Sequence, residues 1–223
     1  MNDATLYLVR HGAIALPTER FYIGQIDAPL SEEGVEQART LRKWLQPVRF
    51  ARVISSDLRR ARRTAGIISG DSACGLEPDR DLREISLGDW EGRTFSEVQQ
   101  RFPVEFAARG RDIENWRPPG GESFADCRTR VMSALHSILQ HTRGNILLVA
   151  HAGVNRLILC DALGIAVAKL HSFGQDYGCL NIIEFSATRT RLKLLNFTPP
   201  TEQAIAELAT ALNMQVEQEQ EAG

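Results

Sequence analysis

The chain has 223 residues, 43% of them hydrophobic, and its 26 basic and 28 acidic side chains give a formal net charge of −2. This length and hydrophobic content predict one large domain with a sizeable core, and they exclude a disordered chain and a small disulfide scaffold. The near-neutral charge excludes a large basic surface for nucleic acid or membranes, so any anion must be bound locally.

Nothing in the sequence predicts export or insertion into a membrane. The longest apolar run, around residues 146–150, has the length of a strand, whereas a membrane span needs about 18 apolar residues. The acidic N-terminus does not fit a signal peptide, and the scattered cysteines fit reduced thiols better than a disulfide framework or a zinc site. We therefore expect a cytoplasmic protein.

The chain begins with a predicted strand and helix. Residues 5–9 form a β-branched and aromatic run that is typical of a buried strand, and a loop follows to about residue 30. Ser31 then provides an N-cap for an amphipathic helix that reaches Pro47.

A second strand and helix follow, with the strand at residues 52–55 and the helix at residues 58–68, capped by Ser56 or Asp57. Positive charge near a helix N-terminus opposes the macrodipole, so the arginines there indicate a compensating anion or carboxylate. They are Arg59, Arg60, Arg62 and Arg63. Because successive residues turn by about 100°, we expect at most two of them to point into one pocket.

The middle and the end of the chain differ in regularity. Residues 74–121 are predicted to be an irregular excursion over the strand ends, with one short helix near residues 94–102. The later elements are a long helix at 123–141, a buried strand at 146–150, a helix at 152–163 and strands at 180–185 and 192–197. Residues 199–223 form an acidic, helix-prone tail, for which packing on the domain, a homodimer interface and a free tail remain alternatives, and low hydrophobicity after Met214 favours fraying.

Strands that alternate with helices predict a three-layer α/β/α fold with a largely parallel central sheet. Ligands bind such sheets at the carboxyl ends of the strands, so the loops that follow the three best strands should meet at one edge. Two of these loops begin with Arg10-His11-Gly12 and His151-Ala152-Gly153, and the third leads to Arg60. Histidines, arginines and helix N-termini at one edge predict a pocket for a phosphate dianion.

A series of motifs, in this order along the chain, resembles the histidine phosphatase superfamily, in its phosphoglycerate-mutase-like branch. The motifs are residues 8–12 (LVRHG), 24–31, 55–65, 82–92, 119–123 (PGGES) and 150–153 (AHAG). The resemblance implies a catalytic domain over residues 1–198, in which residues 74–121 shape the active site.

The same resemblance implies a covalent mechanism. His11 would attack phosphorus and become a phosphohistidine, which water then hydrolyses. Arg10, Arg60 and His151 would hold the phosphate oxygens, and Glu84 would protonate the leaving group and then activate water. Neither a metal nor a cofactor is implied.

Further substrate contacts are assigned from the resemblance to Gly12, Gly24, Gln25 and Ala152. The first loop departs from the family pattern at two positions: Ala13 replaces a polar residue, and Pro17 replaces an asparagine that normally contacts phosphate. Gly24 or Gln25 is expected to substitute for that asparagine.

Several side chains have a structural alternative beside the functional one. Glu91 competes with Glu84 for the acid role, although the motif favours Glu84. Trp90 and Trp116 suit either the pocket wall or the core. Surface roles are expected for Arg59, Arg62, Arg63, His136, His141 and His171.

The resemblance favours a phosphatase over a mutase, because the span between Glu84 and Ser123 is too short for the insertion of the mutases. The motifs are most similar to those of bacterial alpha-ribazole phosphatases, which act in cobalamin biosynthesis. A broad-specificity sugar-phosphate phosphatase and a phosphoglycerate mutase are the alternatives within the family. A non-catalytic module that binds phosphate or phosphoprotein is the alternative of another class.

Overall fold

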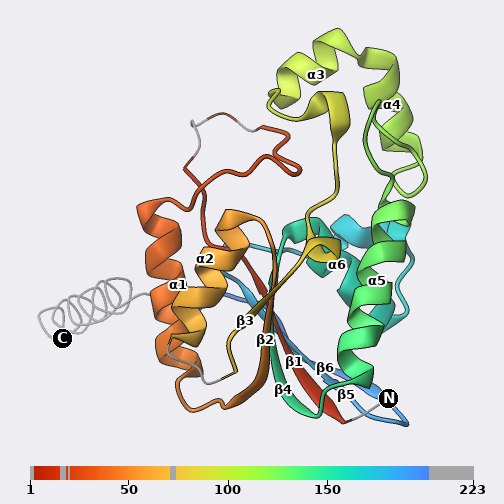
Figure 1. Cartoon of the computed structure of the whole chain (residues 1–223). Coiled ribbons are helices and arrows are strands. Elements are labelled where there is room, and N and C mark those ends of the chain that lie inside the picture. Colours follow the sequence, from red (N-terminus) through yellow and green to blue (C-terminus); the bar gives the residue numbers. More distant parts are fainter. Residues whose placement is uncertain (1–2, 16–18, 20, 71–73, 201–223) are drawn as a thin grey trace, which may run out of the picture.

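The computed structural model describes residues 3–15, 19, 21–70 and 74–200, and the statements below concern these residues. A six-stranded sheet lies at the centre, in the order β3-β2-β4-β1-β5-β6 (Figure 1). The strands are β1 (Ala4–Arg10), β2 (Phe50–Ser56), β3 (Leu76–Asp79), β4 (Gly144–Ala150), β5 (Leu180–Phe185) and β6 (Thr190–Phe197).

The sheet is parallel on one side and antiparallel on the other. Strands β1, β2, β3 and β4 run parallel, while β5 is antiparallel to β1 and β6 is antiparallel to β5. Parallel neighbours need long crossover connections, which helices provide here, whereas a short turn joins β5 to β6. The prediction of a three-layer, largely parallel α/β fold is confirmed.

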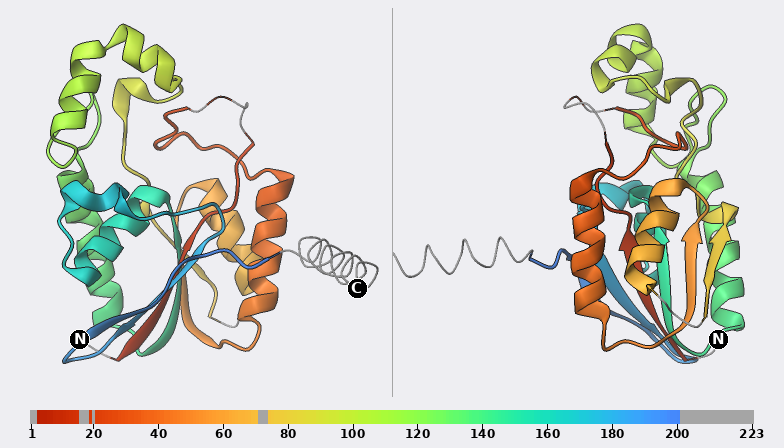
Figure 2. Two further views of the ribbon diagram at one scale, coloured as in Figure 1. Left: turned by 180° about the vertical axis from the view of Figure 1, so that it is seen from behind. Right: turned by 60° about the vertical axis from the view of Figure 1, so that its left-hand side comes forward.

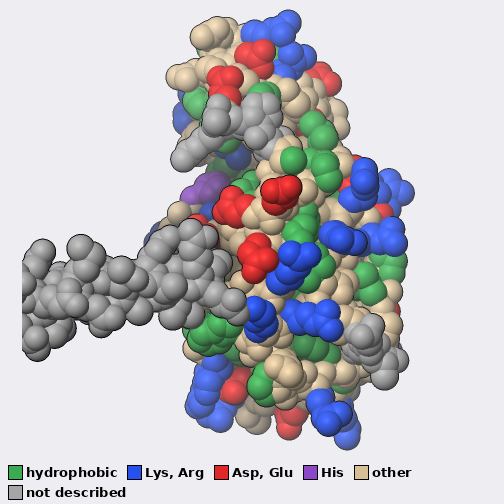
Figure 3. All heavy atoms as spheres, turned by 90° about the vertical axis from the view of Figure 1, so that its left-hand side faces the viewer, with side chains coloured by type: hydrophobic (Ala, Val, Ile, Leu, Met, Phe, Trp, Pro, Cys, Tyr) green, Lys and Arg blue, Asp and Glu red, His purple; other side chains and the backbone are tan. Residues whose placement is uncertain are grey.

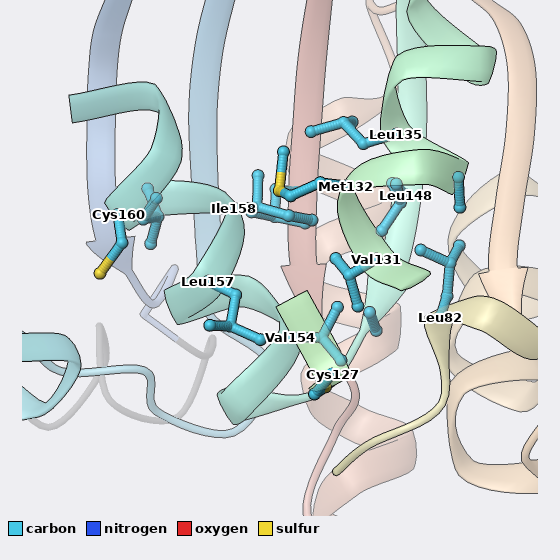
Figure 4. Close-up of a cluster of buried hydrophobic side chains, with 14 of the residues drawn as sticks. Leu82, Cys127, Val131, Met132, Leu135, Leu148, Val154, Leu157, Ile158 and Cys160 are labelled. Atoms are coloured by element: carbon cyan, nitrogen blue, oxygen red, sulfur yellow. The ribbon is translucent and has the colours of Figure 1, made fainter. Parts of the chain in front are cut away.

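Helices cover both faces of the sheet, as the two views in Figure 2 show. Helices α1 (Glu32–Leu45) and α2 (Arg59–Ser69) cover one face, and α5 (Phe124–Gln140) and α6 (Ala152–Leu163) cover the other. Side chains of β4 alternate between the two cores: Ile146 and Leu148 pack with α5 and α6, and Leu147 and Val149 pack with α1 and α2. Figure 4 shows the core on the α5 and α6 face, around Leu148.

The two N-terminal helices begin in different ways. Ser31 caps α1 as predicted, because its hydroxyl accepts a hydrogen bond from the Gly34 N–H. The prediction that Ser56 or Asp57 caps α2 is wrong. The N-cap is Leu58, whose side chain offers no acceptor, and the carboxylate of Asp27 accepts the Arg59 N–H instead, at 2.7 Å. A residue distant in sequence therefore caps this helix.

We expect replacement of Asp27 by alanine to lower the free energy of unfolding by about 1 kcal/mol, because the Arg59 N–H would lose its acceptor. Asparagine at this position keeps a capping oxygen and should recover most of the loss. Urea denaturation measures both variants, with the exposed Glu36→Ala as a control. A loss in Asp27→Asn as large as in Asp27→Ala would exclude capping as the cause.

The middle of the chain is more ordered than predicted. It contributes the edge strand β3 and two helices, α3 (Phe95–Arg101) and α4 (Pro103–Arg111), which stand above the carboxyl edge of the sheet (Figure 1). Strand β3 reads LEPD and has no apolar alternation, which is why its pattern does not predict a strand. We call residues 80–121 the cap. The acidic tail lies outside the described residues from position 201 onward.

Among the described residues, no helix is both long enough and apolar enough to span a membrane.

Candidate functional site

A pocket of about 260 Å³ lies between the carboxyl edge of the sheet and the cap. Four side chains singled out in the sequence line it, namely Arg10, His11, Arg60 and Glu84, together with Gly24 and Ala152. Parallel strands bring them together, because β1, β2 and β4 all end at this edge.

His11 follows β1, and its contacts fix the state of its ring. Its Nδ1 lies 2.8 Å from the carbonyl oxygen of Gly12, which can only accept, so Nδ1 carries the proton. The lone pair is then on Nε2, which accepts a hydrogen bond from the Arg60 Nε–H at 3.2 Å. Burial lowers the pKa of His11 well below its ordinary value, and the charges of Arg60 and Arg10 lower it further. The ring is therefore neutral, with a lone pair on the nitrogen that faces Arg60.

Arg60 is the inward member of the arginine cluster on α2 and is only 1% exposed. Its Nη1 and Nη2 donate to the carbonyl oxygens of Ile26 and Gly24, at 2.5 and 2.8 Å, which fixes the guanidinium beside His11. The other cluster members, Arg59, Arg62 and Arg63, line a groove between α1 and α2, on the surface that Figure 3 shows with many basic side chains. The helix thus sends one arginine into the pocket, within the predicted limit of two.

Arg10 closes the pocket from the side of β5. Its Nη1 donates to the carbonyl oxygen of Gln175 at 2.5 Å, and its guanidinium lies over the ring of Tyr177, 3.7 Å from the centroid. Its buried Nε has no hydrogen-bond partner among the described residues. Arg10 therefore keeps a donor for a ligand in the pocket.

His151 follows β4 and lies beside His11, with ring centroids 5.1 Å apart. It is 0% exposed, yet neither ring nitrogen has a partner in the described part of the chain. Burial lowers its pKa well below the ordinary value, with Arg60, His11 and Arg10 adding to the shift. Buried polar groups normally have partners, so the unpaired ring nitrogens beside His11 leave a donor for a ligand at this edge. Unlike the other four predicted catalytic residues, His151 is not among the residues that line the pocket.

Both buried histidines should make stability depend on pH. Their pKa values are lowered in the folded protein, so below about pH 6.5 the unfolded chain binds protons that the folded protein does not. The free energy of unfolding should then fall as the pH falls, by up to about 1.4 kcal/mol per pH unit for each histidine. Urea unfolding at pH 7, 6 and 5 measures the slope. Equal slopes for the wild type and a His11→Gln, His151→Gln double variant would contradict this origin.

Glu84 projects from the cap onto the N-terminus of α6. Its Oε2 accepts the Gly153 N–H at 3.1 Å, and its Oε1 accepts the N–H of Ile85 at 3.0 Å. Glu91 does not line the pocket, since its Oε1 accepts the N–H groups of Gln25 and Leu87 and joins two loops. Of the two carboxylates, Glu84 is the one in position to reach a ligand.

An ion pair that the sequence analysis missed holds Glu84 in place. Arg130 on α5 makes a two-pronged contact with Glu122, at 2.8 Å for each prong, and also donates to the carbonyl oxygen of Glu84 at 3.1 Å. Glu122 in turn accepts the Ser86 N–H at 2.9 Å. The only signal in the sequence was the PGGES motif, which contains Glu122.

The four residues assigned to substrate contact have different positions. Gly24, with a φ of 49°, and Ala152, the first residue of α6, line the pocket. Gly12 does not: its N–H donates to the Thr64 hydroxyl, and a Cβ there would collide with the backbone of α1. Gln25 does not line it either, because its side chain donates to the carbonyl oxygen of Glu84. Gly12 and Gln25 therefore support the site from behind.

The remaining candidates divide between surface, core and pocket. Trp90 is fully buried against Trp116, with ring centroids 4.9 Å apart, and neither lines the pocket. His136 and His141 are exposed on α5 and at its end, as expected. His171 differs from its expected surface role, because it lines the pocket although it is exposed.

Of the two departures from the family pattern, Ala13 lies among the described residues and Pro17 does not. Ala13 is buried, and its N–H donates to the Gln37 side chain at 2.8 Å. Pro17 lies outside the described residues. Within the described ranges, no three His, Cys, Asp or Glu side chains are grouped as metal ligands.

Known proteins are similar to this chain over almost all of the described residues. The sequence model of the histidine phosphatase superfamily (branch 1) matches residues 6–198. The adenosylcobalamin/alpha-ribazole phosphatase of Escherichia coli K12 is 32% identical over 193 residues, which are 86% of this chain and 95% of that protein. The glucosyl-3-phosphoglycerate phosphatase of Mycolicibacterium vanbaalenii is 35% identical over 75% of this chain and 77% of that protein. The crystal structure of the alpha-ribazole phosphatase from Shigella flexneri is similar at a TM-score of 0.80 and 31% identity, over 87% of this chain and 96% of that one.

Proposed function

Since the chain belongs to the histidine phosphatase superfamily and is a phosphatase, we propose that it hydrolyses the phosphate monoester of a small metabolite through a phosphohistidine on His11. The observation that carries this proposal is the state of His11. Its ring is neutral and buried, and its Nε2 lone pair faces the pocket cations. Such a nitrogen is a nucleophile at neutral pH.

In the first step, Nε2 of His11 attacks phosphorus, the P–N bond forms and the bond to the ester oxygen breaks. The leaving alkoxide takes a proton from the carboxyl group of Glu84 and departs as the alcohol. In the second step, Glu84 takes a proton from water, the resulting hydroxide attacks phosphorus, and the P–N bond breaks to release phosphate. Together the two steps return His11 and Glu84 to their starting states.

The cations around His11 stabilise the charge that this reaction moves. Arg10 and Arg60 are held by the carbonyl oxygens of Gln175, Ile26 and Gly24, so they need little reorganisation when phosphate binds. His151 is a further donor, because its ring nitrogens have no other partner among the described residues. Proteins bind a phosphate dianion well with fixed, charged donors of this kind.

The comparisons support alpha-ribazole 5'-phosphate, an intermediate of cobalamin biosynthesis, as the first substrate to test. Relatives named for that activity match over almost their whole length. A broad-specificity sugar-phosphate phosphatase is the second candidate, and the relative named for glucosyl-3-phosphoglycerate favours it. A phosphoglycerate mutase has less support, because the span between Glu84 and Ser123 holds just a 3₁₀ turn and the two short helices α3 and α4. A non-catalytic phosphate module has the least, since it would not need Glu84 beside the pocket.

A panel of phosphate esters tests the proposal. Initial rates of phosphate release would be compared for alpha-ribazole 5'-phosphate, 3-phosphoglycerate, fructose bisphosphates and nucleotides. We expect release from at least one small ester, with alpha-ribazole 5'-phosphate preferred if the chain shares its relatives' activity. No release from any ester, with phosphate still bound, would favour the non-catalytic module.

A further inference from the structure

Two arginines and a histidine line the pocket in addition to the side chains that the mechanism uses. They are Arg109 on α4, Arg156 on α6 and His171 on the 3₁₀ helix Val167–Ser172. They come from three elements that are distant in sequence, so no motif brings them together and only the fold does. We call the two arginines the outer cations, because burial and the arginine charges lower the pKa of His171 and leave its ring a neutral donor.

Neither outer cation forms an ion pair with a carboxylate in the described part of the chain. Arg109 makes no ion pair or hydrogen bond within the described residues, and Arg156 donates only from Nε, to the carbonyl oxygen of Phe173 at 3.3 Å. Two nearby arginines do have carboxylate partners. Arg83 pairs with Asp57 and Arg130 pairs with Glu122, each through two hydrogen bonds. The fold therefore neutralises nearby arginines but leaves the outer cations available.

The outer cations lie close to His171 and are partly buried. The charges of Arg156 and Arg109 both act on the His171 ring, and both arginines are half-buried. Burial of a guanidinium costs free energy unless an anion offsets it. The charges of Arg10 and Glu84 also act on the pKa of Arg156, so this arginine lies near the phosphate end of the pocket.

Apolar and aromatic side chains surround these charges. Tyr22, Phe95 and Phe124 line the same pocket, and the ring of Phe124 meets that of His171 edge to face, with centroids 6.2 Å apart. This wall excludes water from one side of the outer cations, which strengthens their attraction for an anion. The phosphate end already has Arg10, Arg60 and His151, so a single phosphate group does not account for the two outer cations.

We propose that the outer cations form a second anion subsite, so that the preferred substrates are phosphate monoesters whose alcohol part carries a carboxylate or a second phosphate. This inference rests on the proposed phosphatase function and narrows its substrate class. An ester of a neutral alcohol leaves the outer cations unpaired and is the poorer substrate, so a preference for alpha-ribazole 5'-phosphate in the panel above would count against the subsite but not against the phosphatase.

Matched substrate pairs test the subsite. Glycerol 3-phosphate and 3-phosphoglycerate differ only in a hydroxymethyl group against a carboxylate, and fructose 6-phosphate and fructose 1,6-bisphosphate differ in a second phosphate. We expect kcat/KM to be about 10- to 100-fold higher for the acidic member of at least one pair, the effect of one or two charged hydrogen bonds. The pair that shows the ratio identifies the anion. Ratios near one in both pairs would overturn the subsite.

Substitutions then assign the ratio to residues. In Arg109→Met, Arg156→Met and His171→Gln the ratio should fall toward one, whereas the exposed Arg111→Met on the same helix as Arg109 should keep it. A ratio that persists in all three variants, each shown to be folded by thermal denaturation, would refute the assignment. A wild-type protein that hydrolyses neither p-nitrophenyl phosphate nor any other ester would contradict the phosphatase itself, and with it the subsite. Turnover of the aryl ester without discrimination would contradict the subsite alone.

Discussion

Replacing His11 by alanine is expected to remove covalent labelling and to lower kcat by about 10⁴-fold or more, as loss of a nucleophile does in other enzymes. The physical reason is that Nε2 of His11 carries the lone pair of a neutral ring, because Nδ1 holds the ring proton against the carbonyl oxygen of Gly12. The wild type, mixed with a ³²P-labelled ester and quenched in denaturant at alkaline pH, should retain one acid-labile label per chain. The His11→Ala variant should retain none.

Two comparisons make this experiment decisive. His136→Ala removes an exposed histidine far from the pocket and should label as the wild type does. His151→Ala keeps the nucleophile but loses the neighbouring ring, so it should label more slowly and still carry phosphate on His11. Label on the His11→Ala chain at the wild-type level would place the nucleophile elsewhere. If the wild type hydrolyses an ester but rapid quenching during turnover finds no label on the protein, water attacks phosphorus directly.

Replacing Glu84 by glutamine is expected to slow hydrolysis of alkyl phosphates by about 10²- to 10⁴-fold, the usual contribution of a general acid or base. Glutamine keeps the size of the side chain and can still face the Gly153 N–H through its oxygen, but it has no proton to give to an alkoxide. An activated aryl leaving group needs no such proton. Formation of the phosphoenzyme from p-nitrophenyl phosphate should therefore slow far less than its formation from an alkyl ester.

The later step separates the two roles of Glu84. Breakdown of the phosphoenzyme needs a base for water, so Glu84→Gln should accumulate labelled protein even with the aryl substrate. Glu91→Gln serves as the comparison within the same loop, and any loss there should be the same for aryl and alkyl esters, because Glu91 holds backbone N–H groups and does not reach the pocket. If Glu84→Gln slowed formation of the phosphoenzyme equally with both leaving groups, Glu84 would not be the acid.

The position of Glu84 illustrates how much of this site depends on support from behind. Its backbone oxygen accepts hydrogen bonds from Gln25 and Arg130, and its carboxylate meets the N-terminus of α6. Three segments far apart in sequence thus hold Glu84 at the pocket that His11 also lines. Gln25 was expected to touch the substrate, but its side chain instead holds the backbone of Glu84, which lines the pocket.

Most of the regular elements could be predicted because their signals are local. The buried strand at residues 146–150 is a continuous apolar run, and the helix that begins after Ser31 has both a cap and an apolar face. Where the local signal was weak, prediction failed. Strand β3 has no alternation of apolar and polar residues. The first N–H of α2, that of Arg59, is accepted by Asp27, which lies more than thirty positions earlier in the chain.

By itself, the sequence determined the alternation of strands and helices, the sheet edge where the loops would meet, and the motifs that indicate the family. These follow from periodicity and from residues adjacent in the chain. Only the tertiary structure decided which groups meet: that Arg60 alone of its cluster enters the pocket, that Glu84 rather than Glu91 faces it, and that the outer cations gather there. Such contacts join residues tens of positions apart, and their geometry depends on how helices and loops pack around the sheet, which no local pattern encodes.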